Sequence, residues 1–275
     1  MAKSFLAKIK EDIEKTGFIT ELKIGEQLHS KGWHVSHSES YEDLDTFKSR
    51  EIDIVATKSY DDSNLNLHIE YHFVIEAKKM TKYPWVIFTT PFVFRGWGWR
   101  LLHSGWNYTT KKASIFKPKV LSDNNPLNTK RRFGKAFYEA FKKQNSDENS
   151  KIFDAILSVC KAAYYKKINE GAEKPFSTDF NPEESVELHF YLPIIALEGR
   201  LIEAYLENGD IALQEESWIP LEYSISSNKF EKSNVTFFPS VVTTDGFEDY
   251  IGLVNVWIDS TNKNFSSELK KIKKI

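Results

Sequence analysis

Three ionisable residues, two acids and one lysine, lie within or at the end of two apolar runs of the sequence. Glu76 and Lys78 end the run that begins near His72, and Asp53 lies inside the shorter run 51–55. Alternate side chains of a strand share a face, so Glu76 and Lys78 are expected to point the same way. A carboxylate and an ammonium beside a buried strand are costly unless they pair or bind an ion.

These residue types suit phosphate chemistry that depends on a divalent metal. Two carboxylates placed close together repel, and a hard cation such as Mg²⁺ relieves that repulsion while keeping waters for further chemistry. Bound water becomes more acidic and supplies hydroxide for attack on a phosphodiester. Lys78 would orient that water or offset charge that develops on the phosphate. Glu21, earlier in the chain, would contact the metal directly or through water.

The helix expected over residues 18–30 would carry Glu21 at the edge of its buried stripe. That stripe is predicted to contain Phe18, Leu22, Gly25 and Leu28. Lys31 and Gly32 end the helix in the usual way, with a cation in the last turn and a glycine just past it. A shorter helix is expected over residues 3–15.

Three strands joined by short connections are predicted after this helix, at 33–38, 51–57 and 65–78, with a loop at 39–49 and a turn at 60–64. Short connections favour an antiparallel meander packed on the helix. Further along, the pattern predicts these elements: helices over 130–143, 152–169 and 247–258, strands over 84–88, 186–197 and 237–244, and a hairpin of 201–206 with 211–216. The helix over 130–143 rests on the i, i+4, i+8 spacing of Phe133, Phe137 and Phe141.

Composition describes an ordinary globular protein of 275 residues with a net charge of −2. No apolar run approaches the roughly 20 residues that span a membrane, so no membrane partner is expected. The single Cys160 excludes an internal disulfide framework and, with no signal-peptide pattern at the N-terminus, indicates a cytoplasmic protein. Without repeats or a clear linker, residues 1–275 are interpreted as one elaborated domain.

Charge is distributed unevenly along the chain. Residues 78–143 hold 15 Lys and Arg against two acids, or +13, which leaves 22 basic and 37 acidic residues, or −15, in the rest. Such a segment suits an anion-binding surface, although a solvated surface would carry the same imbalance. The stretch 92–108 interleaves Arg with Trp and Phe; these side chains would either stack on bases or fill a small core.

With these residues in order, the chain resembles the PD-(D/E)xK nuclease superfamily, which has the restriction endonuclease-like fold. The motif is carried by Glu51-Ile52-Asp53 and Glu76-Ala77-Lys78, preceded by Glu21 and the pair Gly32-Trp33. The resemblance covers residues 16–80 as motif, with a core continuation over 130–197 and a C-terminal elaboration over 198–275. It implies a mixed-sheet α/β fold with an αβββαβ core, extended by C-terminal hairpins and helices.

The resemblance also implies roles for individual residues. Asp53, Glu76, the carbonyl of Ala77 and the accessory Glu21 would bind Mg²⁺, or Mn²⁺ in its place, and Lys78 would be the catalytic lysine. Ile52 stands where the motif has proline, and the 23-residue separation of Asp53 from Glu76 requires a long third strand or an inserted turn.

The expected activity is therefore metal-dependent hydrolysis of DNA phosphodiester bonds, in restriction or anti-phage defence. Two alternatives stay open: a nuclease that acts on RNA, and a catalytically inactive module of the same fold that binds nucleic acid or a partner protein. The sequence also leaves open a homodimer, which would cut both strands of a duplex, and a helicase-like partner.

Overall fold

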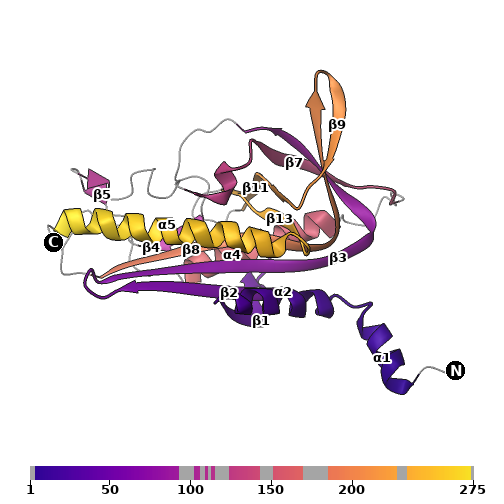
Figure 1. Ribbon diagram of the computed structural model, residues 1–275, viewed down its shortest axis with the longest axis horizontal. Coiled ribbons are helices and arrows are strands. Elements are labelled where there is room, and N and C mark those ends of the chain that lie inside the picture. Colours follow the sequence, from indigo (N-terminus) through magenta and orange to yellow (C-terminus); the bar gives the residue numbers. More distant parts are fainter. Residues whose placement is uncertain are drawn as a thin grey trace.

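The computed structural model describes residues 4–92, 102–105, 109–110, 113–114, 124–142, 151–169, 185–227 and 234–273. Most of the predicted aromatic stretch 92–108 and much of the basic segment lie outside these residues. The chain forms a mixed α/β structure around one large sheet, as the sequence predicts (Figure 1). Among the described residues, no helix combines the length and apolar character needed to cross a membrane.

The N-terminal third forms two helices and three long antiparallel strands. These elements are α1 (Phe5–Ile13), α2 (Phe18–Ser30), β1 (His34–Asp43), β2 (Lys48–Asp62) and β3 (Leu67–Pro91). Antiparallel pairing of β1 with β2 and of β2 with β3 confirms the predicted meander. The strands are longer than predicted: β1 runs into the expected loop, and β3 includes the separately predicted strand 84–88.

The rest of the chain adds one central strand, several short strands and two long helices. They are β4 (Leu102–Gly105), β5 (Thr109–Thr110), β6 (Ala113–Ser114), the 3-10 turn η1 (Pro126–Asn128), β7 (Arg132–Glu139), α4 (Lys151–Asn169), β8 (Val186–Glu207), β9 (Asp210–Glu215), β10 (Trp218–Pro220), β11 (Tyr223–Ser226), β12 (Asn234–Phe237), β13 (Ser240–Thr243) and α5 (Phe247–Lys273). The main sheet has the order β1-β2-β3-β8-β13-β10.

Strands β3 and β8 pair in parallel over most of their length, from Leu67 opposite Val186 to Phe88 opposite Ala204. Parallel neighbours need a crossover, and α4 lies in the connection between these two strands. A second parallel pair joins β8 to β13. Beyond the crossover, β8 turns tightly into β9 through Asn208 and Gly209, both with positive φ, which confirms the predicted hairpin.

The side chains of β3 alternate between two cores on opposite faces of the sheet. Phe73 and Ile75 pack with apolar residues of α2 and α5, whereas Val74 packs with α4. Both faces are thus covered by helices, so the central strands are buried on both sides, as is usual for parallel pairs (Figure 1). The same alternation puts Glu70, His72 and Glu76 on the α4 face of β3.

The predicted helix over 130–143 is wrong: Arg132–Glu139 is β7, which pairs antiparallel with the far part of β3. The spacing that suggested a helix is ambiguous, because residues four apart also share a face of a strand. Phe133 is fully buried, whereas Phe141 lies past the strand and is 83% exposed. The packing of β7 requires glycine at Gly134, since a Cβ there would meet Leu221 and Ile87 within 2.5 Å.

The buried stripe of α2 also differs from the prediction. Phe18 and Leu22 are exposed, and the helix instead buries Thr20, Ile24, Gly25 and Leu28. Thr20 donates a hydrogen bond to Glu198 on β8, and a Cβ on Gly25 would lie 2.8 Å from the ring of His37 on β1. A close approach at Gly25 therefore sets how α2 meets the sheet.

The aromatic contacts of α5 are expected to carry much of the stability of its core. Trp257 is fully buried and meets Tyr71 and Phe190 edge to face, with ring centroids 5.4 and 5.7 Å apart. We expect Trp257→Ala to lower the free energy of unfolding by about 3–5 kcal/mol in urea denaturation. Val256→Ala, at a position that is 54% exposed, should change it by less than about 0.5 kcal/mol. Equal effects of the two substitutions would contradict this view of the core.

Candidate active site

Asp53 lies at a point where β2 leaves β3 and where its pairing with β1 is interrupted at one position. The pairing of β2 with β3 begins at Ile54 opposite Ile75, and the pairing with β1 omits Asp53 and Ser38. Ser38 has φ of 56°, in the left-handed region that non-glycine residues adopt at a cost of about 1–3 kcal/mol. Irregular pairing of this kind often redirects a side chain.

The Asp53 side chain replaces the missing ladder contact. Its Oδ2 accepts a hydrogen bond of 2.7 Å from the backbone N–H of Ala77 on β3. This bond ties Asp53 to the backbone between Glu76 and Lys78, and the Lys78 ammonium in turn pairs with Glu76. Burial raises the pKa of the Asp53 carboxyl, although the Ala77 hydrogen bond and the Lys78 charge oppose the shift.

Glu76 is buried and both of its carboxylate oxygens have protein partners. Oε1 pairs with the Lys78 ammonium, and Oε2 accepts a hydrogen bond of 2.8 Å from the Ser158 hydroxyl on α4. Burial raises the pKa of Glu76; the Lys78 charge opposes this and the Asp53 carboxylate adds to it. Ser158 was missed by sequence reasoning, since only the packing of α4 on the sheet brings it to Glu76.

Glu21 approaches the same carboxylates from α2. Burial raises the pKa of its carboxyl, and the charges of Asp53, Glu51 and Glu76 raise it further. The helix is held there by Thr20, which bonds to Glu198, and Glu198 also pairs with Lys79 at 2.7 Å. The fold thus gathers negative charge from α2, β2 and β3 beside one amine, Lys78.

The raised pKa values of these neighbouring carboxyls mean that their ionised forms are unfavourable in the folded protein. A cation placed among these carboxylates would relieve both their burial and their mutual repulsion. The donor set therefore fits a hard divalent ion. The three carboxylates nevertheless do not form a tight ligand group: among the described residues, three ligand atoms lie within 4.8 Å of one another only in Glu70, His72 and His189.

The basic segment contributes less free positive charge than its sequence suggests. In its described part, several cations pair with acids: Lys79 with Glu198, Lys130 with Glu216, Arg132 with Glu203, Lys135 with Glu222 and Lys142 with Glu139. Arg132 grips Glu203 through two bonds of 2.9 Å. Arg132 therefore attaches β7 to β8, while Lys130 and Lys135 attach β7 and the residue range before it to the chain that follows β9.

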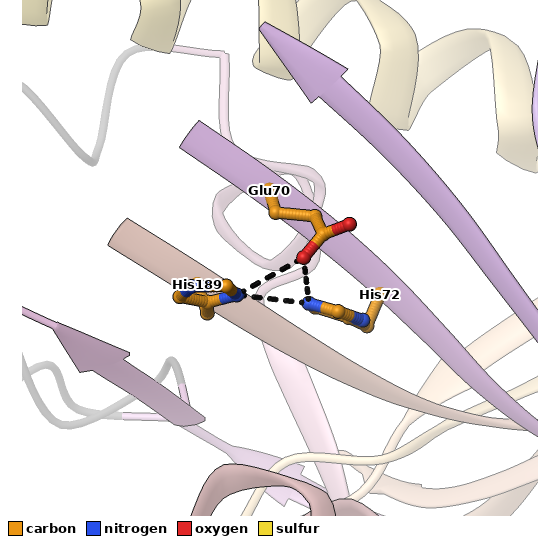
Figure 2. A group of neighbouring side chains, drawn as sticks. All are labelled: Glu70, His72 and His189. Carbon is orange, nitrogen blue, oxygen red and sulfur yellow. Dashed lines mark hydrogen bonds and ion pairs between the residues drawn. The ribbon is translucent and has the colours of Figure 1, made fainter. Parts of the chain in front are cut away.

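A second polar cluster lies on the same face of β3 and was not expected. Glu70 and His72 meet His189 of β8 (Figure 2). His189 also bonds to Glu187. Strand alternation puts Glu70 and His72 on the same face as Glu76. Nothing in the sequence paired them with His189, because that contact depends on the register of β3 with β8, which puts Glu70 opposite His189.

Ion pairing dominates the electrostatics of this second cluster. Hydrogen bonds from His189 and His72 hold the pKa of Glu70 well below its usual range. Burial alone would lower the pKa of His189, but its bonds to Glu70 and Glu187 outweigh burial and raise it.

Cys160 is fully buried in the α4 core, and burial raises the pKa of its thiol, which agrees with an inert packing role.

Comparison of the chain with protein-family models, with curated proteins and with solved structures finds no match.

The Glu21 carboxylate is expected to cost stability in metal-free buffer at neutral pH. Because its folded pKa is raised, the cost appears as pH rises through the unfolded and then the folded pKa, and it is absent at lower pH. Glu21→Gln should therefore raise Tm in EDTA at pH 7.5, and the gain should shrink toward pH 4. Glu26→Gln, at an exposed position of the same helix, should leave Tm unchanged. A lower Tm for Glu21→Gln would show that the carboxylate stabilises the fold.

Proposed function

We propose that the protein is a divalent-metal-dependent nuclease that hydrolyses phosphodiester bonds of DNA. The observation that carries this proposal is the meeting of Asp53 with the Glu76-Ala77-Lys78 segment through the Ala77 N–H. The carboxylate of Glu21 lies close enough that the charges of Asp53 and Glu76, added to burial, raise its pKa. Acidic groups from a helix and two strands converge beside a single amine. That combination suits a metal ion and a phosphate.

The strand arrangement supports the same proposal. The order β1-β2-β3-β8, with β8 parallel to β3 after a helical crossover, is consistent with the αβββαβ core expected for the PD-(D/E)xK superfamily. Asp53 falls on the second strand and Glu76 and Lys78 on the third, as that resemblance requires. The hairpin of β2 with β3, paired from Ile54 opposite Ile75 to Asp62 opposite Leu67, spans the long separation of Asp53 from Glu76.

Each residue then has a role that its surroundings permit. Asp53 and Glu76 would hold Mg²⁺ or Mn²⁺, with Glu21 as an accessory acid and the carbonyl of Ala77 as a further donor. A bound Mg²⁺ supplies an acidified water and stabilises charge on a phosphate. Lys78, which pairs with Glu76 in this structure, would turn its ammonium toward the phosphate oxygens, and Ser158 would keep Glu76 in place.

Cleavage of plasmid and single-stranded DNA with Mg²⁺ or Mn²⁺ at low salt tests the proposal. Asp53→Ala and Glu76→Gln should each lower the rate by about 100-fold or more, the scale expected when one electrostatic stabiliser is lost. Glu42→Gln, at an exposed position of β1, should cut like the wild type. Equal rates for wild type and Asp53→Ala would show that the catalytic assignment is wrong. If RNA were cut in preference to DNA, the proposed substrate would be RNA, and the proposed catalytic residues would stay the same.

One observation favours a second candidate, a non-catalytic module of the same fold. Both oxygens of Glu76 and one oxygen of Asp53 already have protein partners, so the carboxylates are partly neutralised without a metal. Such a module would bind nucleic acid or a partner protein and would not need a cation.

Calorimetric titration with Mn²⁺ separates the two candidates. The nuclease should bind the ion saturably at this site, and Glu76→Ala should abolish that binding while Glu42→Gln retains it. Mn²⁺ binding that is absent from the wild type, or unchanged by Glu76→Ala, would favour the module.

A further inference from the structure

The cluster on β3 and β8 brings three metal-ligating atoms to one point. Nε2 of His72 and Nδ1 of His189 lie 3.2 Å apart, and each lies 3.2 Å from the same oxygen, Oε2 of Glu70. Figure 2 shows the three side chains converging from the two neighbouring strands. The atoms therefore form an almost equilateral triangle.

This triangle has the size that a tetrahedral zinc-class ion requires. With ligand bonds of about 2.0–2.1 Å, two ligands of a tetrahedral ion lie about 3.3–3.4 Å apart. An ion at that bond length would sit slightly out of the plane of the three atoms, with its remaining position open to water. Two imidazoles with one carboxylate favour Zn²⁺ and similar transition metals over Mg²⁺, which prefers oxygen ligands alone.

The residues around the triangle include a carboxylate that would orient one of the metal-binding histidines. Nε2 of His189 lies 3.0 Å from Oε1 of Glu187, so an N–H on that nitrogen would leave Nδ1 free as a ligand. Metal-bound histidines commonly donate their other N–H to a carboxylate in this way. The two histidine side chains are 7% and 6% exposed, and that of Glu70 is 27% exposed. The ion would thus lie in a largely dry site with one accessible side.

Charge and packing agree with this arrangement. A dication between two neutral imidazoles, with Glu70 bound and Glu187 behind His189, has no net charge, which a buried site favours. His72 stacks on Tyr191 with ring centroids 4.6 Å apart, so its ring is held by packing. His68 lies nearby, with its ring 6.2 Å from that of His189, but its Nδ1 bonds to Asp61 at 2.7 Å.

We propose that Glu70, His72 and His189 bind one zinc-class dication that cross-links β3 to β8, with Glu187 as a positioning residue for His189. The cross-link would join strands whose ligands are 117 residues apart in the chain. It is distinct from the proposed Mg²⁺ site, since His72 precedes Glu76 by four residues, or about 13 Å along a strand. This inference does not rest on the proposed nuclease activity.

Zinc binding by the full chain tests the inference directly. The protein is stripped with a chelator and titrated with Zn²⁺ against a chromophoric competitor, and Co²⁺ serves as a second probe because tetrahedral coordination gives strong visible absorption. We expect one equivalent to bind to the wild type. His189→Ala and His72→Ala should remove this binding, and Glu187→Gln should weaken it by about 10–100-fold, as for other residues that support a ligand.

Matched variants separate this site from its neighbours. His68→Ala removes an adjacent histidine and should bind Zn²⁺ like the wild type, and Asp53→Ala should do the same even if it abolishes DNA cleavage. At free Zn²⁺ about 100 times Kd, the ratio of folded to unfolded protein should rise by about 100-fold, which appears as an increase in Tm. Glu70→Gln, which keeps the shape of the side chain, should lose most of this increase.

Two results would overturn the inference. One is a wild-type protein that binds no stoichiometric Zn²⁺ or Co²⁺ and keeps the same Tm with either ion. The other is binding that persists undiminished in both His189→Ala and Glu70→Gln, since the ion would then lie elsewhere. If a histidine variant fails to fold, Glu70→Gln and Glu187→Gln still decide the question, because both preserve the size of the side chain.

Discussion

The parallel pairing of β3 with β8 is the constraint on which the rest of the structure depends. It requires a crossover, and α4 provides one and covers the face of the sheet that carries Glu70, His72 and Glu76. The same pairing continues beyond the meander into the region where β7 and β9 attach. This pairing places Glu70, His72, Glu76 and His189, and the flanking strand β2 brings Asp53 to the backbone between Glu76 and Lys78.

The carboxylates near Asp53 illustrate how such a frame supports groups that would otherwise oppose folding. Burial of Asp53 and Glu76 is unfavourable, and the apolar cores on both sides of β3 supply the stability that offsets it. The irregular backbone at Ser38 and the departure of β2 from β3 occur at the same level of the sheet. Local departures from regular structure thus coincide with the polar site, as they often do where function opposes stability.

Part of this fold could be predicted from the sequence, because the alternation of side chains between the two faces of a strand depends only on local spacing. The shared face of Glu76 and Lys78 followed from it, and the antiparallel meander followed from the short connections between the strands. What failed depended on contacts distant in sequence. Residues four apart share a face in a helix and in a regular strand alike, so the spacing of Phe133 and Phe137 could not decide between the two. The pairing with β3 decides it, and a register shift between Gly134 and Ala136 separates the two phenylalanines in β7. The stripe of α2 was misplaced because apolar type alone did not reveal the bond from Thr20 to Glu198 or the close approach at Gly25.

The continuity of β3 also limits how the chain can vary. Glu70, His72 and Glu76 lie on one uninterrupted strand, so inserting or deleting a single residue between 72 and 76 would turn one cluster toward α5 while the other stayed toward α4. A change of two residues would preserve the orientation but alter the separation of the clusters by about 7 Å. Length changes are therefore expected to be tolerated in the turn at 63–66 far better than within this part of β3.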